Sequence, residues 1–215
     1  MPSPYELVLG TELDGLHPRL RSYFAAIPPG HHGLGSGVFD RVGTPRRWLW
    51  PLLWLLQRPG VLFPGWHRDV PFVVVNTPGV AGDGFPRVVA RRHFTFVAGE
   101  RVMRDSIEAV DGPERGGRPR LVDNLGRPRL IEAGLDARVI DGAMHLSSTV
   151  VAVRLGRLRV PIPAVMAPTV AVVERFDAGT DSQHVAVELS APLLGRLYEY
   201  SGSFHYEIRS GDGEQ

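Results

Sequence analysis

The sequence predicts a mainly β fold of the α+β class, either an antiparallel β-barrel or a strongly curled sheet of roughly eight or nine strands. N-terminal helices are expected to pack against this sheet or to plug it. Valine-rich runs in which apolar and polar residues alternate follow one another from residue 70 onward. Turn residues separate these runs and no helical pattern intervenes, which favours antiparallel pairing over β-α-β crossovers. A sheet of this size closes or curls because exposed strand edges promote aggregation.

Several segments carry the strand pattern, and tight turns join most of them. Ala98-Gly99-Glu100 and Asp141-Gly142 are typical of short hairpins, whereas residues 177–181 form a longer connection. The expected strands are residues 70–76, 87–97, 101–110, 121–124, 130–140, 144–155, 169–176, 184–189 and 196–208.

The N-terminal part of the chain is predicted to be helical instead. Residues 4–9 favour a short helix, and residues 18–26 favour a second one with Pro18 at its tolerated first position. The glycine- and proline-rich segment 28–37 between these helices and the next is expected to be flexible.

A third helix is predicted over residues 46–58, which are apolar nearly all round. Pro51 is expected to kink it. A bilayer-spanning helix needs about 20 apolar residues, so this one is too short to cross a membrane. The favoured interpretation is a buried helix that plugs or flanks the sheet. The alternative is a helix that lies in a membrane interface with its arginines at the headgroups.

The composition predicts a single domain over residues 1–215, with a helical part (1–66), a β part (67–208) and a flexible tail (209–215). Hydrophobic residues make up 43% and charged residues 22%, as in ordinary globular domains. A net charge of +1 provides no overall field that would attract nucleic acid or acidic membranes. The first residues lack the pattern of a signal peptide, so a cytoplasmic location is expected.

The composition also excludes several kinds of chemistry. There is no cysteine, which excludes thiolate nucleophiles and iron–sulfur clusters. All 24 basic residues are arginine, so no lysine can form a Schiff base or a P-loop. Residues 33–37 lack the spacing of a dinucleotide-binding loop, and the adjacent side chains of His31 and His32 diverge. We therefore expect no cofactor and no metal.

Alternation along the strands places two acidic residues on apolar faces. Asp105 shares a face with Met103 and Ile107, and Glu174 shares a face with Val172. A buried carboxylate costs several kcal/mol unless it is paired or protonated. Two interpretations remain open for each acid: a structural pair with an arginine, or a group with a raised pKa that is suited to proton transfer.

The last strand places a row of aromatic residues on one face, including Tyr198, Tyr200 and Phe204. These residues either pack the core or orient a ligand inside a cavity. The candidate catalytic residues are Asp105, Glu174 and His93, and the candidate substrate-binding residues are Tyr200, Tyr198, Arg104, Trp50 and Trp54.

Short motifs in the C-terminal half give a resemblance to a known family. They are Glu100-Arg101-Val102-Met103-Arg104-Asp105, Val122-Asp123-Asn124-Leu125-Gly126, Arg159-Val160-Pro161-Ile162-Pro163, Glu174-Arg175-Phe176-Asp177 and Pro192-Leu193-Leu194-Gly195-Arg196-Leu197-Tyr198. From about Val70 onward the chain resembles the bacterial domain-of-unknown-function 4166 family. Members of that family also occur fused behind saccharopine-dehydrogenase-like oxidoreductases, so the resemblance implies an oxidoreductase partner that would act in trans. It supplies no catalytic residues.

These observations favour a protein that binds a hydrophobic small molecule in a barrel-like pocket. Such a pocket could act as a cofactor-independent cyclase or isomerase of a polyketide- or terpenoid-like substrate, by holding a reactive conformer beside one acid–base group. The alternative is a non-catalytic lipid carrier, or a docking module that acts with an oxidoreductase. A nucleic-acid partner is not expected, and the sequence does not determine the oligomeric state.

Overall fold

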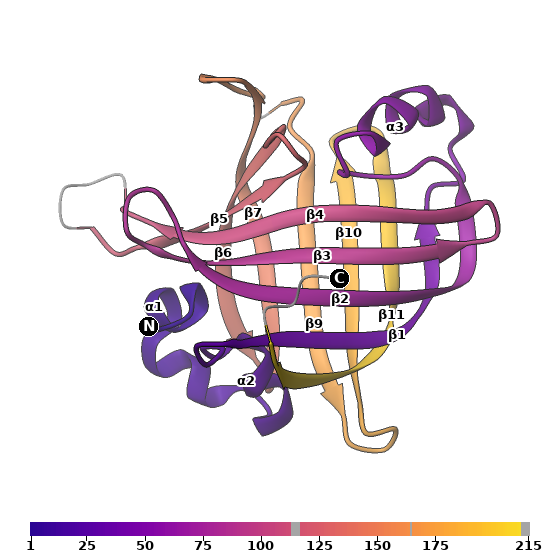
Figure 1. Cartoon of the computed structure of the whole chain (residues 1–215). Helices are drawn as coiled ribbons and strands as arrows, with labels where there is room; N and C mark the ends of the chain where they lie inside the picture. Colours follow the sequence, from indigo (N-terminus) through magenta and orange to yellow (C-terminus); the bar gives the residue numbers. More distant parts are fainter. Residues whose placement is uncertain (113–116, 164, 212–215) are drawn as a thin grey trace.

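A computed structural model describes residues 1–112, 117–163 and 165–211. Within these residues the chain forms one antiparallel sheet of 11 strands, with short helices in its N-terminal part (Figure 1). The strands are β1 (His31–Gly43), β2 (Trp66–Val80), β3 (Pro86–Phe96), β4 (Gly99–Val110), β5 (Arg120–Leu125), β6 (Ile131–Ile140), β7 (Ala143–Leu155), β8 (Leu158–Pro161), β9 (Thr169–Asp177), β10 (Ser182–Ala191) and β11 (Gly195–Ser210).

Ten of these strands close into a barrel, because β6 pairs with β7 as well as with β5. The order around the ring is β6-β5-β4-β3-β2-β1-β11-β10-β9-β7, and β8 pairs with the end of β7 outside the ring. Closure gives every ring strand a neighbour on both sides, which satisfies the backbone hydrogen-bonding groups and leaves no edge in the ring. The predicted antiparallel barrel is confirmed.

Strand β1 occupies much of the glycine-rich segment for which the sequence predicts flexibility, and that prediction is wrong. The strand pairs with β2 on one side and with β11 on the other. Its glycines allow larger side chains from neighbouring strands to pack over it. A Cβ atom at Gly33 would lie 1.8 Å from the Tyr206 hydroxyl, and one at Gly35 would lie 2.6 Å from a methyl group of Val74. Lack of side chains is therefore a packing requirement of this strand.

The nine predicted strands all form, and the structure extends most of them by a few residues. Strand β8 is an additional short strand that the sequence does not predict. Strand β11 continues to Ser210, so the first residues of the predicted tail are ordered in the sheet. The rest of that tail, residues 212–215, lies outside the described residues.

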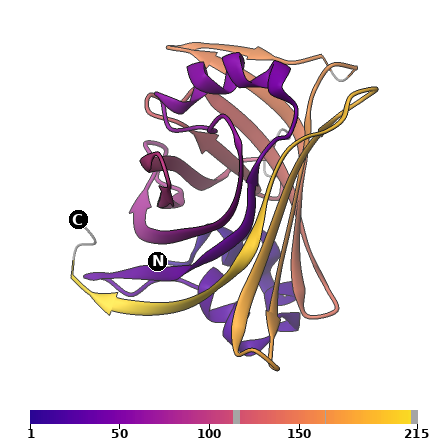
Figure 2. The ribbon, with the colours of Figure 1, turned by 90° about the vertical axis from the view of Figure 1, so that its right-hand side faces the viewer.

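Helices α1 (Pro4–Leu9) and α2 (Pro18–Phe24), joined by the 3-10 helix η1 (Gly10–Gly15), cover one end of the barrel (Figure 2). A capping box between Ser3 and Glu6 begins α1. The apolar side chains of this segment pack against β5, β6 and β7 in a buried cluster. Those on the helical side are Leu9, Leu13, Leu16, Leu20 and Phe24. The predicted plugging role therefore belongs to these two helices.

Helix α3 (Trp50–Gln57) follows the 3-10 turn η2 (Arg47–Leu49) and lies at the opposite end of the barrel (Figure 2). Pro51 lies in the first turn of α3, where a missing N–H costs no hydrogen bond, so it begins the helix and does not kink it. Leu53 is the residue of α3 that is buried. The expectation of a buried helix therefore holds for one face of α3 only.

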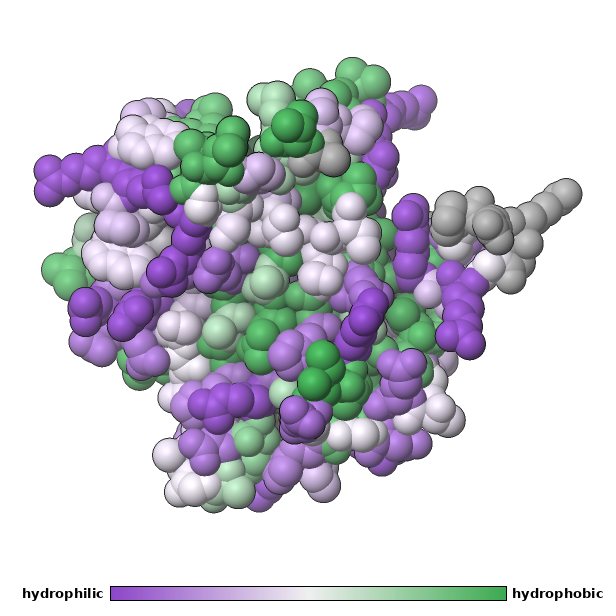
Figure 3. Space-filling view, turned by 180° about the vertical axis from the view of Figure 1, so that it is seen from behind, coloured by the Kyte–Doolittle hydropathy of each residue, from purple (hydrophilic) through white to green (hydrophobic). Residues whose placement is uncertain are grey.

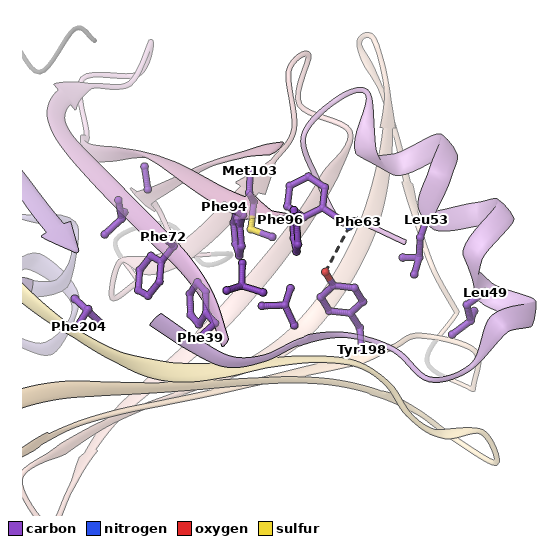
Figure 4. Packing of buried hydrophobic residues seen from close by; sticks show 14 residues of the cluster. Phe39, Leu49, Leu53, Phe63, Phe72, Phe94, Phe96, Met103, Tyr198 and Phe204 are labelled. Atoms are coloured by element: carbon purple, nitrogen blue, oxygen red, sulfur yellow. Dashed lines mark hydrogen bonds between the residues drawn. The ribbon is translucent and has the colours of Figure 1, made fainter. Parts of the chain in front are cut away.

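A second apolar cluster packs inside the barrel along β1–β4 and β11 and extends to Leu49 and Leu53 beneath α3 (Figure 4). The Phe39 ring stacks on Phe72 and Phe94, with centroid distances of 3.8 and 5.3 Å. The backbone N–H of Phe63 donates to the Tyr198 hydroxyl at 3.4 Å. The first cluster lies on the β5–β7 side of the barrel interior and the second on the β1–β4 and β11 side, and the space between them is the candidate site.

A close backbone contact between β1 and β11 makes Gly37 sensitive to substitution. A Cβ atom at Gly37 would lie 2.0 Å from the carbonyl oxygen of Ser203. We expect Gly37→Ala to lower the free energy of unfolding by about 2–3 kcal/mol in urea denaturation, because the two strands would have to separate. The matched Gly82→Ala, in the β2–β3 turn with nothing within 4 Å of the Cβ position, should cost less than about 0.5 kcal/mol. Equal losses in the two variants would contradict this packing role.

Candidate functional site in the barrel interior

A cavity of about 310 Å³ lies inside the barrel between the two apolar clusters. This volume is at the lower end of the range for small-molecule sites, roughly 300–1,000 Å³. Because every second residue of a barrel strand faces inward, the strands supply a mainly aliphatic and aromatic lining. The lining residues of β9 and β10 are Val170, Val172, Glu174, Val185, Val187 and Leu189.

The two ends of the cavity differ. Leu52 of α3 lines the cavity and is nevertheless 53% exposed, so the cavity reaches the surface beside α3. At the other end Tyr5 of α1 and Tyr23 of α2 lie against the cavity. The site is therefore open beneath α3 and closed by α1 and α2.

A buried ion pair crosses from β3 to β4. Ala90 is the register partner of Asp105, which brings the inward-facing Arg92, two residues further along β3, beside the Asp105 carboxylate. The guanidinium of Arg92 donates to Asp105 Oδ1. Burial raises the pKa of Asp105, and the positive charge of Arg92 opposes this shift. Asp105 thus fits the first of the two interpretations, a structural pair with an arginine.

Asp123 adds a second carboxyl group from β5. Its register partner on β4 is Ile107, so it lies diagonally from Asp105 on the inner face. Its Oδ1 atom is buried and accepts no hydrogen bond from the described residues. Burial, and then the negative charge of Asp105, raise the pKa of Asp123 well above its usual range. A buried oxygen of this kind is a position at which a ligand donor would be stabilised.

Glu174 brings a third carboxyl group from β9. It is 8% exposed, and its Oε2 accepts a hydrogen bond of 2.6 Å from Nε2 of Gln183. Burial raises the pKa of Glu174 to about 7, against the opposing effects of Gln183 and Arg92. Near neutral pH this carboxyl group is therefore present in both protonated and ionised forms, which suits it to proton transfer. Glu174 thus fits the second of the two interpretations, a group with a raised pKa that is suited to proton transfer.

Tyrosine hydroxyls complete the polar part of the lining. Tyr200 on β11 lines the cavity, and burial raises the pKa of its hydroxyl above the usual range, so the group stays neutral and can donate a hydrogen bond. A recess of about 20 Å³ adjoins Arg92 and Asp105 and is walled by Tyr5 and Tyr23. The charged groups therefore lie toward the closed end, and the lining becomes apolar toward the mouth.

Four of the predicted site residues line this cavity, and strand alternation is the reason. They are Asp105, Glu174, Tyr198 and Tyr200. Each belongs to the inward-facing set that the alternation predicts, and Asp105, Glu174 and Tyr198 are buried.

Two predicted residues on β3 and β4 lie on the outer face of the barrel. The same alternation that turns Asp105 inward turns its neighbour Arg104 outward, away from the cavity lining. His93, which follows the inward-facing Arg92, pairs with Glu100 across the β3–β4 hairpin. The structure therefore gives neither residue a contact with the barrel interior.

The two predicted tryptophans also lie outside the cavity lining. Trp50 packs at the edge of the apolar cluster beneath α3, and its Nε1 donates to the carbonyl oxygen of Thr44 at 3.2 Å. Trp54 is 53% exposed and carries the guanidinium of Arg58 over its ring at 5.1 Å. From α3 it is Leu52 and Leu56 that reach the cavity instead.

Arg92 and Asp123 are site residues that the sequence analysis does not single out, although the same signal identifies them. Alternation along β3 places Arg92 on the face of Ala90 and Phe94. Alternation along β5 places Asp123 on the face of Leu121. By contrast, no sequence pattern assigns the ring of Tyr23 to the end of a cavity, because that placement depends on how α2 packs.

Two structural features are absent from the described residues. Among them, no three or more His, Asp or Glu side chains converge in a way that could hold a metal ion. In the same part of the chain, no helix combines the length and the apolar character needed to cross a membrane.

Comparison with known proteins gives one family and one curated relative. The model of the family described as "Domain of unknown function (DUF4166)" matches residues 16–204. A protein of Bacillus subtilis (strain 168), named "Uncharacterized protein YndH", is 25% identical over 199 residues, which cover 90% of this chain and 92% of that protein. No solved structure matches.

The raised pKa of Glu174 predicts a specific pH dependence of stability. The pKa rises from 4.5 to about 7 on folding, so the folded protein binds more protons than the unfolded chain in this window and loses stability as the pH rises through it. Glu174→Gln removes this loss while keeping an acceptor for Gln183. We expect the stability of the variant relative to the wild type to increase by about 3 kcal/mol over this window in urea denaturation.

The matched control is Glu188→Gln, a substitution of the same kind on the exposed side of β10, which retains Glu174 and should therefore still lose stability as the pH rises toward 7. Parallel pH profiles of the wild type and Glu174→Gln would show that Glu174 ionises in the usual range of a glutamate.

Proposed function

The chain belongs to the DUF4166 family, and from the geometry of its barrel we propose that it binds a hydrophobic small molecule in the interior. The observation that supports this most directly is a cavity of about 310 Å³ that is apolar at its open end and polar at its closed end. Small-molecule sites have this character, with a mainly apolar wall and a few convergent polar groups that fix the orientation of the ligand.

The charges in the cavity indicate the chemistry of the ligand. Asp105 is neutralised by Arg92, and burial favours the neutral forms of Asp123 and Glu174. A ligand with a strongly charged head would have to be desolvated without a matching countercharge. A neutral head that carries a hydroxyl or carbonyl group can instead exchange hydrogen bonds with these carboxyl groups. A polyketide- or terpenoid-like molecule has this combination of an apolar body and a neutral oxygen.

A cavity-filling variant tests the binding proposal. Val172 and Ala171 are neighbours on β9, but Val172 lines the cavity and Ala171 faces outward. We expect Val172→Trp to weaken the binding of the neutral fluorescent probe Nile red by about tenfold or more, because the indole takes up the space of the ligand. Ala171→Trp is the matched control and should bind the probe as the wild type does.

Native mass spectrometry of the freshly purified protein, followed by organic extraction, identifies what the barrel carries. An apolar compound on the wild type and on Ala171→Trp, but not on Val172→Trp, is the expected result. Equal probe binding by all three proteins would place the apolar site elsewhere and contradict the proposal.

A second candidate function is catalysis by the same site, as a cofactor-independent isomerase or cyclase. The observation that favours it is the Glu174 carboxyl group, with a pKa of about 7 inside an apolar cavity. In an isomerisation, the ionised Glu174 would take a proton from a carbon next to a ligand carbonyl and return it to a second carbon. The hydroxyl of Tyr200 or the protonated Asp123 would donate a hydrogen bond to the carbonyl oxygen while it carries negative charge.

Catalysis is tested on the compound that the extraction identifies, with Glu174→Gln as the variant. We expect the rate of conversion to fall by about 10²–10⁴-fold, since an acid–base group contributes this much. The binding affinity should stay within about threefold, because the amide keeps the shape of the side chain. Asp105→Asn is the second variant, and Glu188→Gln is the control. Turnover by Glu174→Gln at the full rate would rule out this residue as the acid–base group and would favour a non-catalytic carrier.

A further inference from the structure

Exposed apolar side chains gather at the open end of the barrel. Strands β7 and β10 end at this side and β9 and β11 begin at it, because they run antiparallel to one another. Helix α3 and the preceding turn lie at the same end, where Nε of Arg46 donates to the carbonyl oxygen of Arg196 at 2.9 Å. We call six residues the apolar rim, and each is more than half exposed: Trp48, Leu52, Trp54, Leu55, Leu158 and Leu193.

The apolar rim extends over three segments that are far apart in the sequence. Trp48 to Leu55 come from η2 and α3, Leu158 begins β8, and Leu193 lies in the β10–β11 turn. Figure 3 shows hydrophobic residues along the upper edge of the molecule, with strongly hydrophilic residues next to them. Single exposed apolar residues are ordinary, but a group of large ones around the mouth of a cavity indicates an interaction surface.

Positive charge is concentrated around the same end. Residues 41–68, which include α3, hold five arginines and no acidic residue. Residues 142–173, which include the β7–β8 hairpin, hold three arginines and no acidic residue, and two of the three, Arg154 and Arg159, share the single carboxylate of Glu132. The whole chain has a net charge of only +1, so its acidic residues lie mostly elsewhere. A groove of about 420 Å³ next to the rim is lined by the three side chains of Arg41, Arg46 and Arg196, which face the single carboxylate of Glu199.

We propose that the open end of the barrel docks onto the surface of an anionic lipid bilayer. The apolar rim would insert at the boundary between headgroups and acyl chains, and the arginines would lie at the phosphate groups. This surface is inferred from exposed residues and charge, independently of the ligand in the cavity.

The chemistry of the rim matches a bilayer interface. Tryptophan favours this depth because its ring is apolar and its N–H is polar. The guanidinium of Arg58 lies 5.1 Å from the ring of Trp54, so it can remain at the headgroups while the ring is buried. A second copy of the chain on this face would bring two sets of arginines together, which like-charge repulsion disfavours.

Docking in this orientation would also turn the mouth of the cavity toward the bilayer. Leu52 belongs both to the rim and to the cavity lining. An apolar molecule could therefore pass between the membrane and the barrel without crossing water. This last step rests on the proposed function, whereas the docking surface does not.

Vesicle co-sedimentation tests the proposal. We expect the wild-type protein to sediment with vesicles made of equal parts of phosphatidylcholine and phosphatidylglycerol, and much less with phosphatidylcholine alone. Trp54→Glu combined with Leu55→Glu should lower the partition coefficient by about tenfold or more, since two acidic side chains would replace inserted apolar ones. Arg47→Gln combined with Arg58→Gln should lower it by a similar factor on the anionic vesicles only.

The matched control is Ile140→Glu. Ile140 is the last residue of β6 and is exposed at the closed end, near the hydrogen bond from the His17 N–H to the Gly142 carbonyl oxygen. This variant should bind the anionic vesicles as the wild type does. None of these substitutions alters a residue of the cavity lining, so Nile red binding reports separately on the fold and on the proposed ligand site.

Three results would overturn the docking proposal. The first is that the wild type does not sediment with anionic vesicles. The second is that the wild type and the Trp54/Leu55 double variant partition equally. The third is that light scattering shows a wild-type dimer, which the double substitution dissociates, while no vesicle binding is found. If vesicle binding follows the expected pattern but Nile red does not bind, the docking surface stands and the proposed ligand function fails.

Discussion

Pairing of β6 with β7 is the constraint on which the rest of this structure depends, because it closes the sheet into a ring of ten strands. Side chains can just fill the interior of a ring of about eight strands, and wider rings leave space. Here that space is filled at one end by α1 and α2 and along the β1–β4 and β11 wall by the aromatic cluster, while the end beneath α3 stays open. The cavity is what remains between them, so its position follows from closure and from the two kinds of filling.

The same closure determines the chemistry of the interior. Carboxyl groups that face inward lose their hydration, and each responds according to its neighbours. Asp105 has Arg92 beside it and forms an ion pair. Glu174 has the neutral amide of Gln183 as its hydrogen-bond partner, and its pKa rises to about 7. One fold therefore places an ion-paired carboxylate and a carboxyl group with a neutral hydrogen-bond partner in a single cavity.

Much of this site follows from the sequence, because alternation along a strand is a local property. It places Asp105 and Glu174 inside and identifies nine strands, since each side chain is assigned to a face by its parity. Strand β1 is not identified because the first half of its inner face is made of glycines, which leave room for larger neighbours such as the Tyr206 ring over Gly33. For a related reason the sequence does not distinguish Trp54 from Leu52. An almost uniformly apolar helix does not show which face it buries, so only the packing of α3 decides between Trp54 and Leu52.

The two ends of the barrel show that the exposed rim is not a necessary consequence of the fold. At the closed end, the apolar side chains of the N-terminal helices, including Leu20 and Phe24, are directed into the barrel and are fully or almost fully buried. At the open end the same chain leaves Trp48 and Leu55 more than half exposed, although burial of such side chains would contribute about 1.5–3 kcal/mol each. A group of large exposed apolar side chains around the mouth of a cavity and among arginines is explained when that end faces an apolar and anionic surface. A lipid bilayer has both properties, and the closed end then needs no partner.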